Sequence, residues 1–80
     1  MEHKLKLGDL YASTFVDLGG VPPDFEVVRG KTLFVFPAED RVYELLNQFN
    51  SGAPCSALDF VEHMKTLRAR MMDAKRGVPR

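Results

Sequence analysis

Cations are concentrated in the last part of the sequence. The segment from Met64 to Arg80 holds six Lys or Arg residues against one acid, Asp73, whereas Met1 to His63 holds five against ten acids. The two parts therefore carry net charges of +5 and −5, although the whole chain is neutral. Such an asymmetry is typical of a basic segment that meets an acidic partner.

The spacing of these cations predicts a basic row on a helix. Side chains three and four residues apart lie on the same side of a helix. Such a row can follow a phosphate backbone through salt-sensitive, largely non-specific contacts. Alternatively, the cations stabilise the helix dipole and solvate an exposed face. The nucleic-acid interpretation assigns the contacts to Lys65, Arg68, Lys75 and Arg76, and Met72 lies in the same row.

A second candidate surface is the stretch "RGKTLFVF", which starts at Arg29. RNA-recognition sheets combine a basic residue, a glycine and alternating aromatic residues on a four-stranded sheet. Here Lys31 and Thr32 occupy the positions nearest the glycine, and the sequence predicts only two strands. Because a two-stranded ribbon must be covered to be stable, burial of Phe34 and Phe36 in the core is favoured over base stacking.

The sequence offers no pattern for catalysis, a metal or a cofactor. His3 and His63 are its histidines, and neither lies at ligand spacing from Cys55, whereas a zinc site needs about four convergent ligands. Cys55 precedes a helix, but no His–acid pair is evident to activate it. Phosphate-binding glycine motifs are also absent from the sequence. We therefore predict a non-enzymatic protein, without a metal, a cofactor or an evident small-molecule substrate.

The first half of the chain predicts a helix and then a β-hairpin. The stretch "LGDLYASTFVDLGG" has helical spacing, and the preceding residues 4–7 alternate like a strand lead-in. Residues 25–28 are expected to pair with residues 32–35 across a turn near Arg29-Gly30. Leu33 and Val35 then share one face, and the two phenylalanines share the other. The apolar stripe expected on the helix is Leu7, Leu10, Tyr11, Thr14 and Leu18.

The second half predicts two further helices. The first begins between Pro37 and Asp40 and ends before Gly52. The second begins after Ser56 as N-cap and ends near Arg76, with Cys55 and Phe60 at the positions of a hydrophobic staple that would pack the thiol. The expected apolar stripes are Val42, Leu45, Leu46 and Phe49 on the first helix, and Phe60, Met64, Leu67, Met71 and Ala74 on the second.

Together these elements predict an α+β fold in the order α-β-β-α-α, with a two-stranded antiparallel hairpin packed on three helices. We expect a single domain over residues 1–80 with an ordered core at about 5–76. A chain of 80 residues buries only about 60–65% of its unfolded surface, so a partner would add stability. Short apolar runs, the lack of a signal-peptide pattern and a single cysteine predict a cytoplasmic protein that does not contact membranes.

Four stretches together make up one further pattern: "DLYASTFVDLGG", "FVF", "YELLNQFNSG" and "SALDFVEHMKTLRARM". In this pattern the chain resembles a family of short bacterial and phage-associated domains of uncharacterised function. The resemblance spans about Leu5 to Met72 and implies a fold and an association with mobile elements, but no activity. The matching positions are Asp9, Leu10, Ala12, Phe15, Gly19, Phe34, Phe36, Leu45, Phe49, Gly52, Ala57, Phe60, Val61, Leu67, Arg68 and Ala69.

Two functional interpretations follow from the sequence. In the first, the protein is an interaction module that binds a nucleic-acid backbone through its basic C-terminal helix. In the second, it is a protein–protein adaptor or a homodimer in which that helix docks on an acidic or apolar surface.

Overall fold

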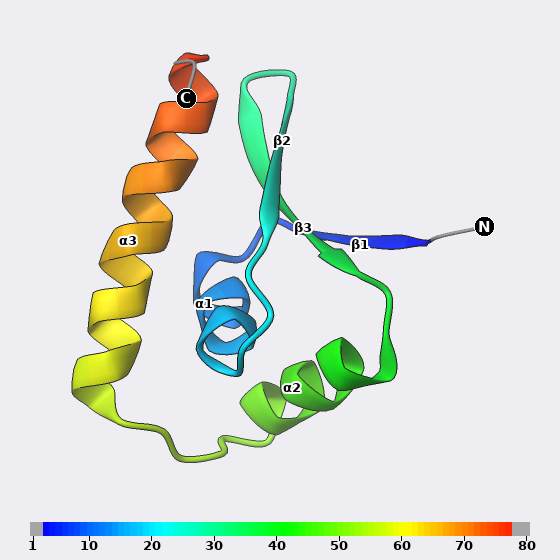
Figure 1. Cartoon of the computed structure of the whole chain (residues 1–80), viewed down its shortest axis with the longest axis vertical. Helices are drawn as coiled ribbons and strands as arrows, with labels where there is room; N and C mark the ends of the chain where they lie inside the picture. The colour runs from blue at the N-terminus through cyan, green and yellow to red at the C-terminus, as the bar shows by residue number, and fades with distance from the viewer. Residues whose placement is uncertain (1–2, 78–80) are drawn as a thin grey trace.

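Three antiparallel strands and three helices make up residues 3–77, the part of the chain that the computed structural model describes (Figure 1). The elements are β1 (Lys4–Leu7), α1 (Leu10–Leu18), β2 (Asp24–Val28), β3 (Lys31–Pro37), α2 (Asp40–Asn50) and α3 (Ala57–Arg76). The predicted α+β class is confirmed. The predicted order and the two-stranded sheet are wrong, because β1 precedes α1 and adds a third strand.

Strand β1 lies at one edge of the sheet, whose strand order is β1-β3-β2. It pairs with the far half of β3, with Leu5 opposite Phe36 and Leu7 opposite Phe34. Both leucines therefore add to the buried face of the sheet. The alternation of residues 4–7 suggested a strand, but its partner lies too far along the chain for any turn signal to indicate the pairing.

The turn between β2 and β3 consists of Arg29 and Gly30. Both have positive φ angles, 54° and 78°, as the two central residues of a type I′ turn require. Val28 consequently pairs with Lys31, and Phe25 pairs with Phe34. The predicted register was wrong by one residue, because it left Lys31 in the turn.

The aromatic side chains of β3 belong to the core. Phe34 is 1% exposed and Phe36 is 0% exposed, while Leu33 and Val35 on the opposite face are half-buried. The ring of Phe34 also contacts that of Phe25, with their centroids 5.6 Å apart. The prediction that Phe34 and Phe36 pack in the core is confirmed, so neither ring is available to stack on a base.

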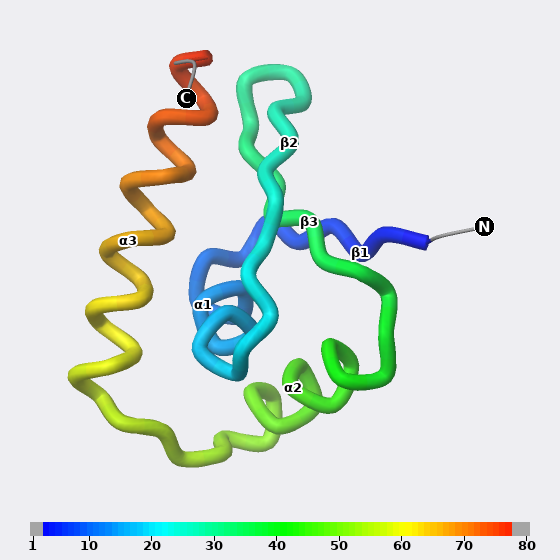
Figure 2. The backbone as a smooth tube through the Cα atoms, in the orientation of Figure 1, coloured from blue at the N-terminus to red at the C-terminus, as the bar shows by residue number. Residues whose placement is uncertain are grey.

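Helix α1 lies between α3, α2 and the sheet (Figure 2). Asp9 is its N-cap, and its Oδ1 accepts hydrogen bonds from the N–H groups of Tyr11 and Ala12 at 2.8 and 3.3 Å. Residues 12–16 are all buried, whereas Tyr11 is 55% exposed. The predicted apolar stripe is therefore wrong at Tyr11, because neighbours on several sides bury more of α1 than one stripe.

The predicted stripe of α2 is confirmed, since Val42 and Leu45 are buried in the core. Helix α3 also begins as predicted, because Ser56 Oγ accepts a hydrogen bond from the N–H group of Asp59. It ends before Gly77, whose φ is 71°. One prediction here is wrong, because Cys55 is exposed and its thiol is not packed as a staple residue would be. None of the helices within residues 3–77 is both long and apolar enough to cross a membrane.

Gly19 provides a close contact between α1 and α2. A Cβ atom at Gly19 would lie 2.6 Å from Cδ2 and 2.8 Å from Cδ1 of Leu45, whose side chain is 3% exposed and held in the core. We expect Gly19→Ala to lower the free energy of unfolding by about 1–3 kcal/mol in urea denaturation, because the added methyl group overpacks this contact. An unchanged unfolding midpoint would contradict the close contact.

Gly20→Ala is the control for this substitution. Gly20 has a φ of 104° and no atom within 4 Å of an added Cβ, so its cost arises from backbone strain alone. Trimming Leu45 to Val should therefore recover stability in the Gly19→Ala protein and not in the Gly20→Ala protein.

Candidate functional site

The hairpin turn and the last turns of α3 lie side by side at one end of the molecule (Figure 1). We call this the basic end, because it carries Arg29, Lys31, Lys75 and Arg76 alongside Asp73. The opposite end holds α2 and the first turns of α3. Its charged residues are Glu39, Asp40, Arg41, Glu44, Asp59 and Glu62. The named residues give net charges of +3 at the basic end and −4 at the opposite end, so the charges are separated in space as well as along the sequence.

Three of the four predicted contact residues have cationic side chains without a hydrogen-bond or ion-pair partner among the described residues. Lys65, Arg68 and Lys75 are exposed, and within residues 3–77 their side chains form no hydrogen bond or ion pair. Arg76 differs, because its guanidinium donates to Oδ1 of Asp73 one turn earlier. Lys75 and Arg76 lie at the basic end, and Lys65 and Arg68 lie nearer the middle of α3.

Arg70 faces away from this row. Its guanidinium carbon lies 5.2 Å from the centroid of the Phe25 ring, over β2. A cation–π contact at an exposed site contributes about 0.5–1 kcal/mol, so Arg70 helps to hold α3 against the sheet. Its guanidinium is therefore less available for contacts with a ligand than the side chains of Lys65 and Arg68.

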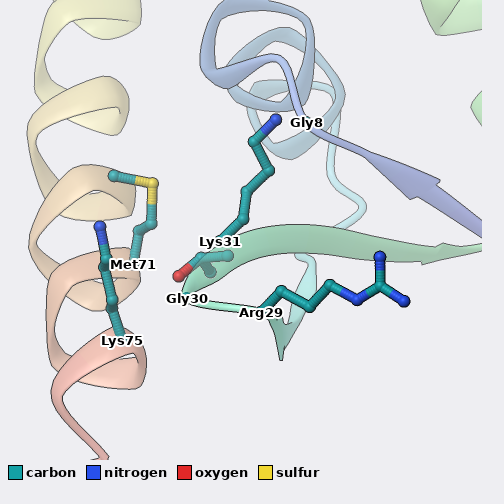
Figure 3. A pocket seen from close by; sticks show the side chains of 7 residues that line it. Gly8, Arg29, Gly30, Lys31, Met71 and Lys75 are labelled. Carbon is teal, nitrogen blue, oxygen red and sulfur yellow. The ribbon is translucent and has the colours of Figure 1, made fainter.

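A pocket of about 330 Å³ lies between the hairpin turn and α3 (Figure 3). Its lining comes from three separate segments: Gly8 from the β1–α1 connection, residues 29–32 from the hairpin, and Met71 and Lys75 from α3. The side chain of Lys31 extends toward Gly8, and that of Lys75 lies beside Met71 (Figure 3). Sequence reasoning treated Lys31 as a turn residue and Met71 as core, so it missed this pocket.

The other face of the hairpin is also hollowed near its tip. A pocket of about 420 Å³ is lined by Val28, Arg29, Lys31 and Leu33. Arg29 points away from α3 (Figure 3), so its guanidinium serves this face and the tip itself. The hairpin tip therefore presents positive charge in more than one direction.

The outer face of α3 combines these cations with exposed apolar side chains. Leu58 is 67% exposed, Val61 38% and Met72 52%. They follow one another and the cations at spacings of three and four residues, which places all of them on one side of the helix. This outer row consists of Leu58, Val61, Lys65, Arg68, Met72 and Lys75.

The other reactive side chains stabilise the fold or lie apart from one another. His63 Nδ1 lies 3.0 Å from Oδ2 of Asp17, which ties α3 to α1. In residues 3–77, no three His, Cys, Asp or Glu side chains are grouped to hold a metal ion. The exposed thiol of Cys55 forms no disulfide. The cationic surfaces are thus the strongest candidate for a functional site.

Comparisons of the chain with models of protein families, with curated proteins and with solved structures find no match. The resemblance to short phage-associated domains stays a prediction. Function must therefore be inferred from the chemistry of the basic end and of the outer row.

Proposed function

We propose that this protein is a non-enzymatic module that binds the phosphate backbone of nucleic acid through Lys65, Arg68 and Lys75. Arg29 and Lys31 extend the contact surface at the basic end, and Arg76 adds to its potential. The observation that supports this most is the convergence of the hairpin cations with the C-terminal cations of α3, two segments far apart in the sequence.

The dimensions of the row suit a nucleic-acid strand. From Lys65 to Lys75 the helix rises by about 15 Å, which corresponds to roughly four phosphates along one strand of a duplex. The side chains of Lys65, Arg68 and Lys75 are exposed and form no ion pair with the described residues, so a phosphate contact with them breaks no such pair. The binding energy would come largely from the release of counterions, and it would carry little base specificity.

The salt dependence of binding tests this proposal. Three to five phosphate contacts predict a loss of roughly 50–500-fold in affinity for duplex DNA between 50 and 200 mM salt. The triple substitution Lys65→Gln, Arg68→Gln and Lys75→Gln should reduce the slope of log K against log salt by about 2.7, or about 0.9 for each cation removed. Fluorescence anisotropy with a labelled duplex measures both quantities.

Arg41→Gln is the control, because it removes a cation from the opposite end, where Arg41 donates to the carbonyl group of Gly19. This variant should keep the wild-type salt slope. No binding at low salt, or an unchanged slope in the triple variant, would contradict the proposal.

A second candidate function is suggested by the apolar members of the outer row. Exposed Leu58, Val61 and Met72 would suit an adaptor that docks α3 on an acidic partner protein with apolar contacts at its centre. Self-pairing is less suited to this face. Two antiparallel copies would bring Lys65 and Arg68 close to the same residues of the partner at the two-fold axis, and parallel copies would oppose every cation with itself.

Pull-down with and without nuclease separates the two functions. If nucleic acid is the partner, nuclease removes the captured material. If an acidic protein is the partner, capture survives nuclease, and Val61→Ala with Met72→Ala weakens it while leaving oligonucleotide binding unchanged.

A further inference from the structure

The pocket between the hairpin turn and α3 offers more than a surface of positive charge. Two lysines from different elements line it, with Gly8 and Gly30 among its other residues. Glycines have no side chain, so they leave the backbone accessible to a ligand.

On the side away from β2, the backbone of β3 at Thr32 has no strand partner among the described residues. The N–H group of Ala38 donates to the carbonyl group of His3 at 3.1 Å, so the even-numbered residues of β3 direct their backbone groups toward β1. Strand β1 ends at Leu7, opposite Phe34. Thr32 is the next residue in this series and lies beyond the end of β1, so its N–H group faces the pocket that it lines.

Thr32 has a second unusual property. It is 7% exposed, and its buried hydroxyl oxygen forms no hydrogen bond with the described residues. A buried hydroxyl group without a partner costs about 1–3 kcal/mol, so a ligand or an ordered water that reaches it would recover this free energy.

The charges around the pocket favour an anion. Lys31 and Lys75 form no ion pair within residues 3–77. The carboxylate of Asp9, beside Gly8, is committed to the N-cap of α1. Asp73, two residues before Lys75, is paired with Arg76. The C-terminal dipole of α3 opposes an anion, and the two ammonium groups outweigh its partial charge of about −0.5.

We propose that this pocket binds a phosphate monoester, such as the terminal phosphate of a nucleic-acid strand or of a free nucleotide. The part of this inference that concerns the attached nucleic-acid strand rests on the proposed function, in which the outer row binds the backbone. A monoester carries a charge of about −1.5 to −2 and three acceptor oxygens, which matches two ammonium groups and one backbone N–H group. An internal phosphodiester carries a single negative charge, and the strand continues on both sides of it. It therefore suits the open outer row better than this pocket.

Binding of two oligonucleotides that differ only at the 5′ end tests this inference. The 5′-phosphorylated single strand should bind roughly 5–10-fold tighter than the same strand with a 5′-hydroxyl group. Lys31→Gln with Lys75→Gln should remove this preference. The matched control, Lys65→Gln with Arg68→Gln, also removes two exposed cations but should weaken both oligonucleotides equally and keep the preference.

The failures of the two proposals are distinguishable. Equal affinity of wild-type protein for both oligonucleotides would overturn the phosphate pocket and leave backbone binding intact. If neither oligonucleotide binds, backbone binding fails, and titration with adenosine monophosphate and with inorganic phosphate then tests the pocket alone through backbone amide chemical shifts.

In this titration, saturable shifts confined to residues 30–32 and 71–75 support the pocket, and diffuse or absent shifts overturn it. Tighter binding of adenosine monophosphate than of inorganic phosphate would identify a free nucleotide as the source of the phosphate. Shifts with inorganic phosphate of equal strength would show that the phosphate group alone is recognised.

Discussion

Leu67→Ala is expected to lower the free energy of unfolding by about 2–5 kcal/mol. Leu67 is 0% exposed and is the buried residue of α3, whose other inward side chains are half-buried. Truncation therefore leaves a cavity where α3 meets the core. Because the total stability of small domains is of the same order, we expect the variant to be largely unfolded at 37 °C. Circular dichroism with urea denaturation measures the loss.

Leu58→Ala is the matched control on the same helix. Its side chain is 67% exposed, so removing the same atoms should change the free energy of unfolding by less than about 0.5 kcal/mol. Similar losses for the two variants would show that α3 is not anchored through Leu67.

Phe36→Ala should have a comparable or larger effect, a loss of about 3–5 kcal/mol. The Phe36 ring is completely buried within the core cluster and lies opposite Leu5 across the β1–β3 ladder. Its removal should loosen the core and also release β1, since this short strand depends on its cross-strand contacts. Thermal unfolding followed by near-ultraviolet circular dichroism reports the loss of packing.

Two comparisons sharpen this prediction. Tyr43→Ala removes a ring that is 46% exposed and should cost much less. Phe36→Leu keeps an apolar side chain and a folded protein, so it should bind oligonucleotides as wild type does. Weakened binding by folded Phe36→Leu protein would argue that the sheet contacts bases directly.

Elements with strong local signals could be predicted from the sequence. Ser56 and Gly77 marked the ends of α3, because capping is a property of a few adjacent residues. The stripe on α2 was correct, since this helix buries a single face that includes Val42 and Leu45. The burial of Phe36 followed from the need to cover a small sheet.

Features that depend on distant contacts could not be predicted in the same way. Strand β1 owes its existence to pairing with β3, and its four residues carry only a weak pattern. Helix α1 buries five consecutive residues because other elements surround it, so a single apolar stripe wrongly predicts that Tyr11 is buried. Cys55 satisfied the spacing of a staple, yet spacing alone does not bring a thiol into the core.

The candidate site shows the same division. The row that contains Lys65 and Arg68 was visible as a periodic pattern on one helix. The pocket was not, because Gly8, Lys31 and Lys75 meet only when the hairpin turn comes to lie beside the end of α3. Its clearest sequence signal was the basic turn at Arg29–Lys31, which indicates a pocket only once this turn is known to lie beside α3.

The separation of cations at one end from carboxylates at the other gives this electrically neutral protein a large electric dipole moment. In the field of a polyanion, such a molecule experiences a torque before it makes contact, and it is turned so that the hairpin tip arrives first. Productive collisions would then be more frequent than random orientation allows. Added salt would slow association more than it speeds dissociation, even though the net charge of the protein is zero.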